Sequence, residues 1–507
     1  DGDRVRVAFW RDVKDGRFEG GIEEVLERGK KWLVGVLAKH ERKFLVECRQ
    51  GKSSLVFYVD REDIQGARLG ETVGIEVVDY PEGKAPGTAR VIQLFGARGE
   101  ESTEIDIVIL KHQLPTKFPT RIRREAQAIV KDRKMDLSKG RRDLRKIPLV
   151  TIDGETARDF DDAICVKKNP KGYTLWVSIA DVSHYIKPGS ELDKEALARG
   201  TSVYFPQKVI PMLPEELSND LCSLRPHEDR LAFTAELHFD SKGNLVGSEF
   251  YKSLIQSQAR LTYTQVAKAM LDQDPDARKK IKESLPMLEQ AFALFRKMRQ
   301  KRLERGSIDF DLPEPNIILD LEEGNIESIV KSERNEAHML IEEFMVAANE
   351  AVAAFVTQSK RPMVYRVHPK PDPEKVSNFA NLLHNLGFHQ AKLPKNPSPK
   401  DMGRVLELAR GHVEEGVVQH FLLRSMKQAI YSPKNEGHYG LASDCYTHFT
   451  SPIRRYPDLV VHRILQSLLS QGPLQGTARS SELKKLEAVT VHASRRERIA
   501  MEAEWEA

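Results

Sequence analysis

Four aspartates lie within ten positions of one short stretch of the sequence, between residues 151 and 162. Asp159 and Asp161 are two positions apart, so in an extended chain their carboxylates point to the same side, whereas Asp162 points to the other. A glycine turn brings Asp153 back toward them. A single arginine offsets these charges, and oxygen ligands at this density suit Mg²⁺ or Mn²⁺. The spacing therefore predicts a site for hard divalent cations.

Carboxylates shared between two such ions are the usual scaffold for hydrolysis of a phosphodiester by water. An exposed acidic turn and a calcium-binding loop are the simplest alternatives. The calcium template fails because the required glycine and the distal glutamate are absent, and Ile164 occupies the last position. Apolar neighbours such as Val150, Ile152 and Phe160 favour partial burial over a solvated turn. We therefore expect metal-dependent chemistry at this loop.

A second polar cluster, between residues 448 and 458, contains Arg454 and Arg455 among aromatic residues and prolines. Guanidinium groups hold phosphates through two hydrogen bonds at once. The cluster also fits an ordinary helix start, with Ser451 as the N-cap and Pro452 at the first position. Both interpretations can hold, because helix N-termini also bind anions. The sequence has no G-x-S-x-G, P-loop, G-x-G-x-x-G or H-E-x-x-H motif, which disfavours nucleophilic serine or cysteine catalysis.

The composition describes a globular protein of several domains, with 507 residues of which 40% are hydrophobic and 30% charged. The net charge of +4 is too small to imply a nucleic-acid partner, so such an argument must be local. The segment from Arg121 to Lys146 is basic, and it is either a solvated linker or a patch that follows phosphates. No apolar run reaches membrane-spanning length, and the four cysteines form no C-x-x-C pair. These features favour a reducing cytoplasm.

Several short alternating apolar runs precede the acidic stretch. Five or six of them between residues 18 and 98 predict a small β-barrel of the oligonucleotide-binding (OB) type. Residues 1–17 carry one further strand-like run, which we interpret as the remnant of a preceding domain. Residues 99–147 are polar and interrupted by prolines, as in a connector. Residues 148–507 then form one large domain.

This large domain combines a sheet with many helices. Alternating apolar residues predict strands at 175–179 and 231–239, followed by a return near residue 250. Helical periodicity is expected at 262–271, 287–305, 336–357, 374–386, 402–412, 417–431 and 480–504. The expected fold class is α+β, with the OB-fold barrel followed by a large mixed α/β domain.

Several longer motifs resemble the ribonuclease II/R (RNB) family. They are the acidic stretch 151–162, Gly-Thr-Ser-Val-Tyr-Phe-Pro at 200–206, Ile-Pro-Met-Leu-Pro at 210–214, Leu-Cys-Ser-Leu at 221–224 and the arginine cluster 448–458. The resemblance covers nearly the whole chain. It implies a cold-shock (OB) domain followed by an RNB catalytic domain, with the first cold-shock domain reduced to its last strand and the C-terminal RNA-binding domain and basic tail absent.

The same resemblance implies a processive 3′-to-5′ exoribonuclease that uses two-metal-ion catalysis. Its products would be nucleoside 5′-monophosphates and a short terminal oligonucleotide, its cofactor Mg²⁺, with Mn²⁺ as the substitute. Its partner would be single-stranded RNA or RNA with a 3′ overhang, and we expect a cytoplasmic monomer that contacts no membrane. Because fewer domains would guard the RNA channel, structured RNA is also an expected substrate.

Residue roles follow from the resemblance, motif by motif. The metal ligands would be Asp153, Asp159, Asp161 and Asp162, with Asp161, Asp162 and Arg454 as the catalytic residues. Arg454 would clamp the scissile phosphate and stabilise the charge that develops on it. Tyr204 and Phe310 would stack on the bases nearest the 3′ end. Glu342 would contact the terminal nucleotides or position Arg454. The alternatives are plain core aromatics and a solvated helix glutamate.

Two rival functions remain at this point. A catalytically dead RNA-binding relative would keep the fold while losing acids from the loop, and the intact loop argues against it. A metal-dependent deoxyribonuclease is the second rival, because carboxylates with Mg²⁺ hydrolyse either backbone. Only contacts to the 2′-OH distinguish the two substrates.

Overall fold

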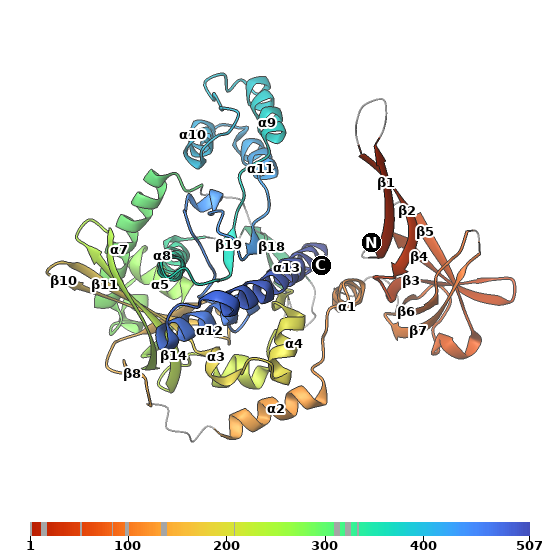
Figure 1. The fold of residues 1–507 in the computed structure, drawn as a ribbon, viewed down its shortest axis with the longest axis horizontal. Helices are drawn as coiled ribbons and strands as arrows, with labels where there is room; N and C mark the ends of the chain where they lie inside the picture. The colour runs from red at the N-terminus through yellow and green to blue at the C-terminus, as the bar shows by residue number, and fades with distance from the viewer. Residues whose placement is uncertain are drawn as a thin grey trace.

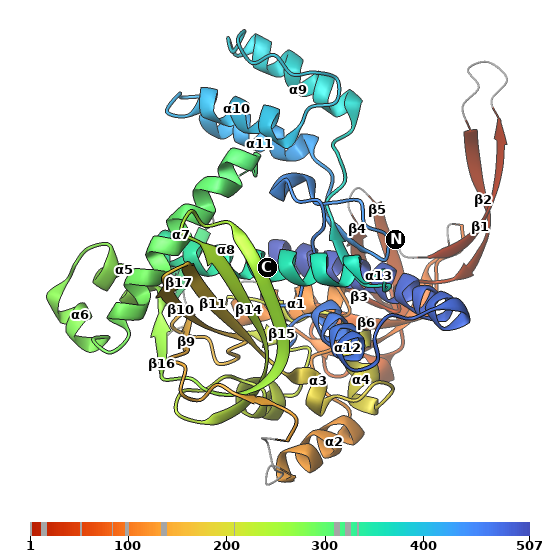
Figure 2. The ribbon, with the colours of Figure 1, turned by 60° about the vertical axis from the view of Figure 1, so that its left-hand side comes forward.

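The computed structural model describes most of the chain, in which a small β domain lies beside a much larger mixed domain (Figures 1 and 2). The described residues are 3–11, 18–50, 53–83, 85–96, 101–132, 139–206, 208–308, 315–319, 326–331 and 334–507. Every helix within these ranges is too short or too polar to span a lipid bilayer.

Five strands form a closed barrel in the N-terminal part of the chain. They are β3 (Trp32–His40), β4 (Lys43–Gln50), β5 (Ser53–Val59), β6 (Thr72–Asp79) and β7 (Gly87–Leu94), with a single 3₁₀ turn, η1 (Arg61–Ile64), after β5. The barrel closes because β3 pairs with β6 and β5 pairs in parallel with β7. Alternate residues point inward, so Leu33, Leu37, Phe57 and Ile75 fill its interior. The predicted OB-type barrel is confirmed.

Two further strands form a hairpin outside the barrel. β1 (Arg4–Arg11) pairs antiparallel with β2 (Phe18–Glu27). This pairing crosses the expected boundary at residue 17. The expected domain limits stay predictions. This hairpin and the strand β8 described below each make a pairing across one of these limits.

The connector between the two domains is more ordered than its polar composition suggests. It contains α1 (Glu101–Lys111), α2 (Thr120–Lys131) and the short strand β8 (Arg142–Asp143). Ile122 and Ala126 of α2 are buried against the large domain, and β8 joins the large domain's sheet beside β15. The connector therefore anchors the barrel to the sheet.

Three arginines of the basic segment within this connector pair with acidic side chains. Arg141 donates to the fully buried Asp181 at 2.6 Å. Arg142 donates to Glu249 at 3.1 Å, and Arg145 pairs with Asp143 and Asp229. These three arginines hold the connector in place, which favours the linker interpretation for this part of the segment. The exposed arginines of α2 are a separate group.

A seven-stranded sheet forms the centre of the large domain, in the order β16-β9-β10-β11-β14-β15-β8. The new strands are β9 (Val150–Asp153), β10 (Asp162–Asn169), β11 (Gly172–Ala180), β14 (Asp229–Asp240), β15 (Leu245–Gln256) and β16 (Ala259–Thr262). The central pairings are antiparallel, whereas β16 joins β9 in parallel and β8 joins β15 in parallel. This order places β9 between β10 and β16, with the end of β9 next to β16.

Short elements between β11 and β14 cover one end of the sheet. They are α3 (Val182–Tyr185), α4 (Glu191–Arg199), the two-residue strands β12 (Val203–Tyr204) and β13 (Val209–Ile210), and the π-helical turn η2 (Glu216–Leu221). Among the strands of the described residues, β12 and β13 pair only with each other. Their hairpin therefore depends on neighbouring helices for support.

Helices make up most of the remaining chain. They are α5 (Tyr263–Met270), α6 (Pro275–Lys280), α7 (Leu285–Arg305), α8 (Glu336–Gln358), α9 (Pro373–Asn385), α10 (Pro399–Ala409), α11 (Glu415–Ser425), α12 (Tyr456–Gln471) and α13 (Gly476–Glu506). Between them lie β17 (Pro315–Leu319), β18 (Ile326–Lys331), β19 (Tyr365–Val367), β20 (Ile430–Ser432) and the 3₁₀ turn η3 (Tyr439–Leu441). The expected helix at 417–431 is wrong after Ser425, because the chain leaves the helix and pairs with β19 as β20.

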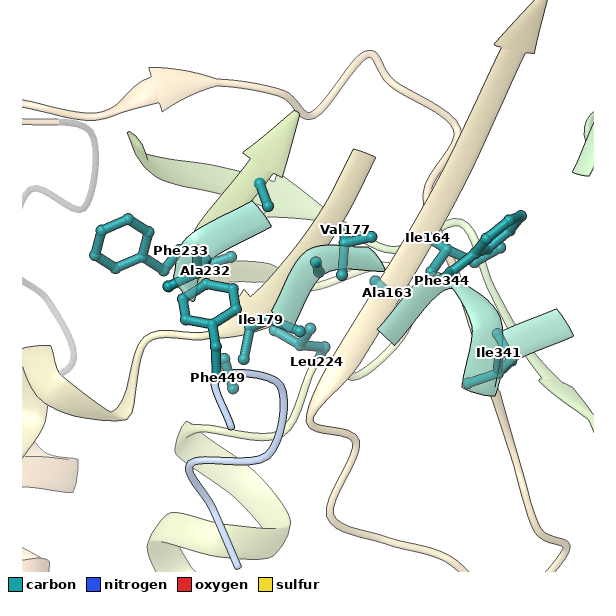
Figure 3. Packing of buried hydrophobic residues seen from close by; sticks show 14 of the residues in the cluster. Ala163, Ile164, Val177, Ile179, Leu224, Ala232, Phe233, Ile341, Phe344 and Phe449 are labelled. Carbon is teal, nitrogen blue, oxygen red and sulfur yellow. The ribbon is translucent and has the colours of Figure 1, made fainter. Parts of the chain in front are cut away.

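The helix α8 packs across the sheet and forms the centre of the main core. Its residues Leu340 and Phe344 are fully buried. Figure 3 shows Phe344 beside Ile164 of β10, and Ile341 belongs to the same cluster. At the other end of the same cluster, the rings of Phe233 and Phe449 meet edge to face with centroids 5.9 Å apart. This packing fixes α8 and the loop before α12 relative to the sheet.

Candidate active site

One cavity of about 540 Å³ lies between the β9–β10 loop, α8 and the loop that precedes α12. The charged and polar residues that line it include Asp153, Asp159, Asp161, Asp162, Tyr204, Tyr263, Glu342, Asn349, His448, Arg454 and Arg455. The two motifs that the sequence singles out, about 290 residues apart, thus face each other across this cavity. The four predicted metal ligands and the predicted phosphate clamp are brought together.

The acidic loop is held by the ends of two strands. β9 ends at Asp153 and β10 begins at Asp162, so the sheet fixes both ends of the loop. Asp161 is only 5% exposed, and its Oδ1 accepts the backbone N–H of Ile453 at 2.9 Å. This bond joins the acidic loop directly to the loop that precedes α12 and carries Arg454 and Arg455, which we call the arginine loop.

Burial raises the pKa of three of the four carboxyls. The pKa of Asp153 rises to about 8, because of burial first and then of repulsion by Asp162 and Asp159. Burial raises the pKa of Asp162 to about 6, although Arg454 opposes the shift. The pKa of Asp161 lies well above its ordinary value for the same reason. The raised pKa values mean that the protein itself does not stabilise the ionised form of these three carboxyls, which a bound cation would favour.

The residues fit a divalent cation in charge and in donor chemistry. All four side chains offer carboxylate oxygens, and the buried Oδ2 of Asp153 has no hydrogen-bond partner. In the described part of the chain, however, no three acidic, histidine or cysteine side chains converge as a ready coordination cluster. The site is an acidic cavity that suits cations rather than a preformed cage.

Arg260 of β16 secures the acidic loop and was not predicted from the sequence. Its Nη2 donates to the carbonyl oxygens of Gly154 and Glu155, both at 2.7 Å. Its guanidinium carbon lies 5.6 Å from the ring centroid of Phe160, and its charge lowers the pKa of Asp153. No local signal marks this arginine, because only the parallel pairing of β16 with β9 brings it near a loop more than a hundred residues earlier.

On the opposite side, Arg455 and Asp458 form the frame of the arginine loop. Arg455 donates to the two carboxylate oxygens of Asp458 at 2.9 and 2.7 Å. Asp458 is fully buried and its Oδ1 also accepts the N–H of Ser451 at 2.8 Å. Arg455 is thus occupied inside the protein. Its neighbour Arg454 is exposed and lines the cavity.

The expected helix start at Ser451 and Pro452 is wrong. The helix α12 begins at Tyr456, with Arg455 as its N-cap and Pro457 in its first turn. The N–H of Ser451 binds the side chain of Asp458 instead, so the residues before Tyr456 form a loop.

Asn349 supports this loop from α8. It is 2% exposed, its Oδ1 accepts the N–H of Phe449 at 2.8 Å, and its Nδ2 donates to the hydroxyl of Tyr446 at 3.1 Å. A buried asparagine with both ends occupied fixes the loop's register. It too lacks a local sequence signal, since its partners lie about a hundred residues further along the chain.

The three other predicted RNA contacts have different outcomes. Tyr204 lies on β12 at the edge of the cavity, 38% exposed, and its hydroxyl donates to Oδ2 of Asp159 at 3.3 Å. Glu342 also lines the cavity, but its side chain pairs with Arg334 at 3.1 and 2.5 Å. Its expected contact with nucleotides stays a prediction. Phe310 lies outside the described residues.

Comparisons with known proteins agree with this arrangement. The RNB domain model matches residues 141–471, and the cold shock domain model matches residues 46–119. The chain is 43% identical to ribonuclease R of Aquifex aeolicus over 97% of its own length and 69% of that protein. It is 40% identical to ribonuclease R of Escherichia coli over 99% of its own length and 62% of that protein.

The fold agrees with solved structures as well. Ribonuclease R of Mycoplasma genitalium, in complex with ribose-methylated single-stranded RNA, superimposes with a TM-score of 0.87 at 27% identity, over 100% of this chain and 79% of that one. The same protein with double-stranded RNA gives 0.85, covering 98% and 87%. The yeast pseudonuclease Ssd1 shares the fold alone, with a TM-score of 0.71 at 18% identity over 96% and 61%.

The barrel, the sheet with its acidic cavity and the matched domains define a 3′-to-5′ exoribonuclease, and the chain belongs to the RNB family. Within that family its relatives are ribonuclease R proteins. Segments 203–206, 424–431 and 454–457 resemble ribonuclease R more than ribonuclease II, and the comparisons confirm this closer resemblance.

Proposed function

We propose that the chain degrades RNA processively from the 3′ end by two-metal-ion hydrolysis, releasing nucleoside 5′-monophosphates and leaving a short terminal oligonucleotide. One observation supports this most strongly: four aspartates, three of them with a pKa raised by burial, line a single cavity together with an exposed arginine. Carboxylates on one side and a guanidinium on the other suit a phosphodiester held between bound cations and Arg454.

The proposed division of labour follows from the contacts. The residues Asp153, Asp159, Asp161 and Asp162 would hold Mg²⁺, or Mn²⁺ in its place. The ions would supply the positive charge that activates water and neutralises the leaving oxygen. Arg454 would bind the scissile phosphate, and its charge is available because Arg455 alone pairs with Asp458. Asp161 and Asp162 would be the catalytic acids nearest to it.

Tyr204 would stack on a base at the 3′ end, since every base offers a π-face and stacking needs no sequence preference. The hydroxyl contact with Asp159 supports this role, because it aims the ring along the edge of the acidic loop. Phe310 and Glu342 are proposed as further contacts to the terminal nucleotides. All the acids and Arg454 come from one chain, so we propose a monomer.

The proposed substrates are single-stranded RNA and RNA with a 3′ overhang, with structured RNA included. The Mycoplasma protein's complexes with both single-stranded and double-stranded RNA support this range. Four free thiols support a reducing compartment, and we propose the cytoplasm.

The test uses 5′-labelled single-stranded RNA, the matching DNA, and an RNA duplex with or without a 3′ overhang, each with Mg²⁺ or EDTA. The expected result is conversion of RNA, and not DNA, to one short oligonucleotide without a ladder of intermediates. An excess of unlabelled RNA added after the start should leave engaged molecules unaffected if the reaction is processive. Thin-layer chromatography of 3′-labelled RNA should show nucleoside 5′-monophosphates.

Cleavage of DNA at a similar rate would favour the deoxyribonuclease alternative. Tight RNA binding without cleavage in Mg²⁺ and in Mn²⁺ would favour a catalytically dead RNA-binding protein. Asp161→Asn is the matched control, because it should bind the same RNA without degrading it.

A further inference from the structure

The hairpin that carries Tyr204 has little support of its own. β12 and β13 contribute two residues each, and no other strand of the described chain pairs with them. Their apolar side chains Val203, Phe205 and Ile210 are buried in a small cluster separate from the main core. The position of Tyr204 therefore depends on whatever forms the rest of that cluster.

The rest of the cluster comes from the connector and from α13. α1 of the connector contributes Ile105, Val108 and Ile109, and the C-terminal part of α13 contributes Ala500 and Ala503. Figure 1 shows this end of α13 next to α1. The two helices and the hairpin thus form a three-way junction.

Polar contacts tie the three elements together in pairs. Glu504 of α13 accepts the backbone N–H of Tyr204 at 2.8 Å. Lys208 of the hairpin pairs with Asp106 of α1 at 2.9 Å. Glu506 of α13 binds Lys111 and His112 at the end of α1. Each pair of these three elements is therefore joined by at least one specific polar contact.

Tyr204 is held at both of its ends. Glu504 fixes its backbone amide, and Asp159 accepts from its hydroxyl at 3.3 Å on the cavity side. With both ends fixed, the ring has one orientation relative to the acidic loop. Without the amide contact, the two-residue strand would be held less firmly, and the ring of Tyr204 would adopt more than one orientation.

The junction also reaches the barrel. α1 packs closely on the barrel strands: a Cβ added to Gly74 of β6 would come within 2.3 Å of Leu110 Cδ2. The barrel, α1 and the Tyr204 hairpin are therefore in continuous contact.

We propose that Glu504 is a positioning residue for Tyr204, and that the junction of α1, α13 and the β12–β13 hairpin determines how short the final RNA product becomes. This inference rests on the proposed stacking role of Tyr204. It adds that a carboxylate at the end of the last helix fixes the stacking ring, and that it acts through the backbone amide rather than by touching RNA.

The test compares Glu504→Ala, Glu504→Gln and Tyr204→Ala in the full chain, with Glu502→Ala, an exposed residue of the same helix, as the control. Two readouts are used: the length of the final product from 5′-labelled RNA, and kcat and KM on short oligonucleotides. Glu504→Ala should lengthen the final product as Tyr204→Ala does. It should also raise KM for short oligonucleotides about two- to tenfold, with kcat on long RNA nearly unchanged, as for one lost hydrogen bond.

Glu504→Gln should behave as the wild type, because its amide oxygen still accepts the Tyr204 N–H. The double variant Tyr204→Ala/Glu504→Ala should show no further change beyond Tyr204→Ala. Lys208→Ala, which breaks the link to α1, should shift the product in the same direction by a smaller amount. This variant keeps the test valid if Glu504→Ala folds poorly.

A normal final product from Glu504→Ala, alongside an altered one from Tyr204→Ala, would overturn this inference and leave the stacking role intact. A normal product from both would overturn the stacking role and the inference together. Equal defects in Glu504→Ala and Glu504→Gln would also overturn it, since the hydrogen bond would then not be what positions the ring.

Discussion

The two sides of the cavity differ in whether the protein itself compensates their charged groups. On the acidic side, burial raises the pKa of Asp153, Asp161 and Asp162, and an oxygen of Asp153 is buried without a partner. On the arginine side, burial alone would lower the pKa of Arg455. The charge of Asp458 more than offsets this effect, so the pKa of Arg455 lies above its ordinary value. One side awaits positive charge from a ligand, and the other is neutralised internally.

This difference separates residues that build the site from residues that use it. The Arg455–Asp458 pair contributes to the fold whether or not RNA is present. The buried acids are unfavourable to ionise until cations bind, and Arg454 has no phosphate to bind until RNA is present. Substitutions on the two sides should therefore separate activity from stability, and the four predictions below test that separation.

The largest expected effect is on turnover in Asp161→Asn. We expect hydrolysis to fall by at least about a thousandfold, equivalent to roughly 4 kcal/mol of transition-state stabilisation, while RNA binding persists. The melting temperature of the metal-free protein should hold or rise, because the buried charge is removed and the amide oxygen can still accept the Ile453 N–H. The measurements are single-turnover cleavage and thermal unfolding.

Glu155→Gln is the matched control for that variant. It makes the same change of charge in the same loop, but Glu155 hydrogen-bonds to Thr264 and does not line the cavity. A melting temperature that drops by many degrees in Asp161→Asn would contradict the view of Asp161 as an uncompensated charge.

Asp458→Ala should instead damage the fold. It leaves Arg455 without its partner inside the protein, which costs about 3–5 kcal/mol of unfolding free energy. The urea midpoint should fall accordingly, whereas exposed Asp444→Ala should change stability by no more than about 0.5 kcal/mol. Full stability in Asp458→Ala would remove the distinction drawn between the two sides.

Arg454→Ala should lower kcat by about a hundred- to a thousandfold, equivalent to about 2.7–4 kcal/mol, because it removes a contact that strengthens in the transition state. Stability should be unchanged, since the side chain is exposed. Arg454→Lys should recover only part of the rate, because an ammonium lacks the two-point geometry. If Arg454→Ala weakened RNA binding alone and left kcat intact, Arg454 would be a strand contact only. Exposed Arg158→Ala in the acidic loop is the control.

The smallest effect concerns pH. The folded-state pKa values of Asp153 and Asp162, about 8 and about 6, lie above the ordinary value of 3.8. The stability they contribute is therefore complete below that ordinary value and is lost as pH rises through 6 and 8. The melting temperature of EDTA-treated protein should fall between pH 5 and pH 8.5, and Mg²⁺ should reduce the fall. Identical curves with and without Mg²⁺ would speak against cation binding at these acids.

The features that could be predicted from the sequence are those whose residues are neighbours in the chain. The alternation of apolar residues is enough to predict the barrel strands and β14. The acidic loop is predictable because its four aspartates lie in one continuous segment. Arg260 and Asn349 could not be predicted, because only sheet pairing and helix packing bring them to their partners. The helix predicted to reach residue 431 failed for the same reason, since the pairing of β20 with β19 overrides local helical preference after Ser425.

The bond between Asp161 and the N–H of Ile453 joins residues that are 292 positions apart. A ribosome that has already made the acidic loop must therefore translate about 290 further residues before the arginine loop exists. At about 5–20 residues per second, this takes roughly 15–60 s. During that interval the growing polypeptide has its cold-shock barrel but an incomplete catalytic centre. A nuclease assembled in this order cannot cut the messenger that encodes it until the ribosome has passed the arginine loop.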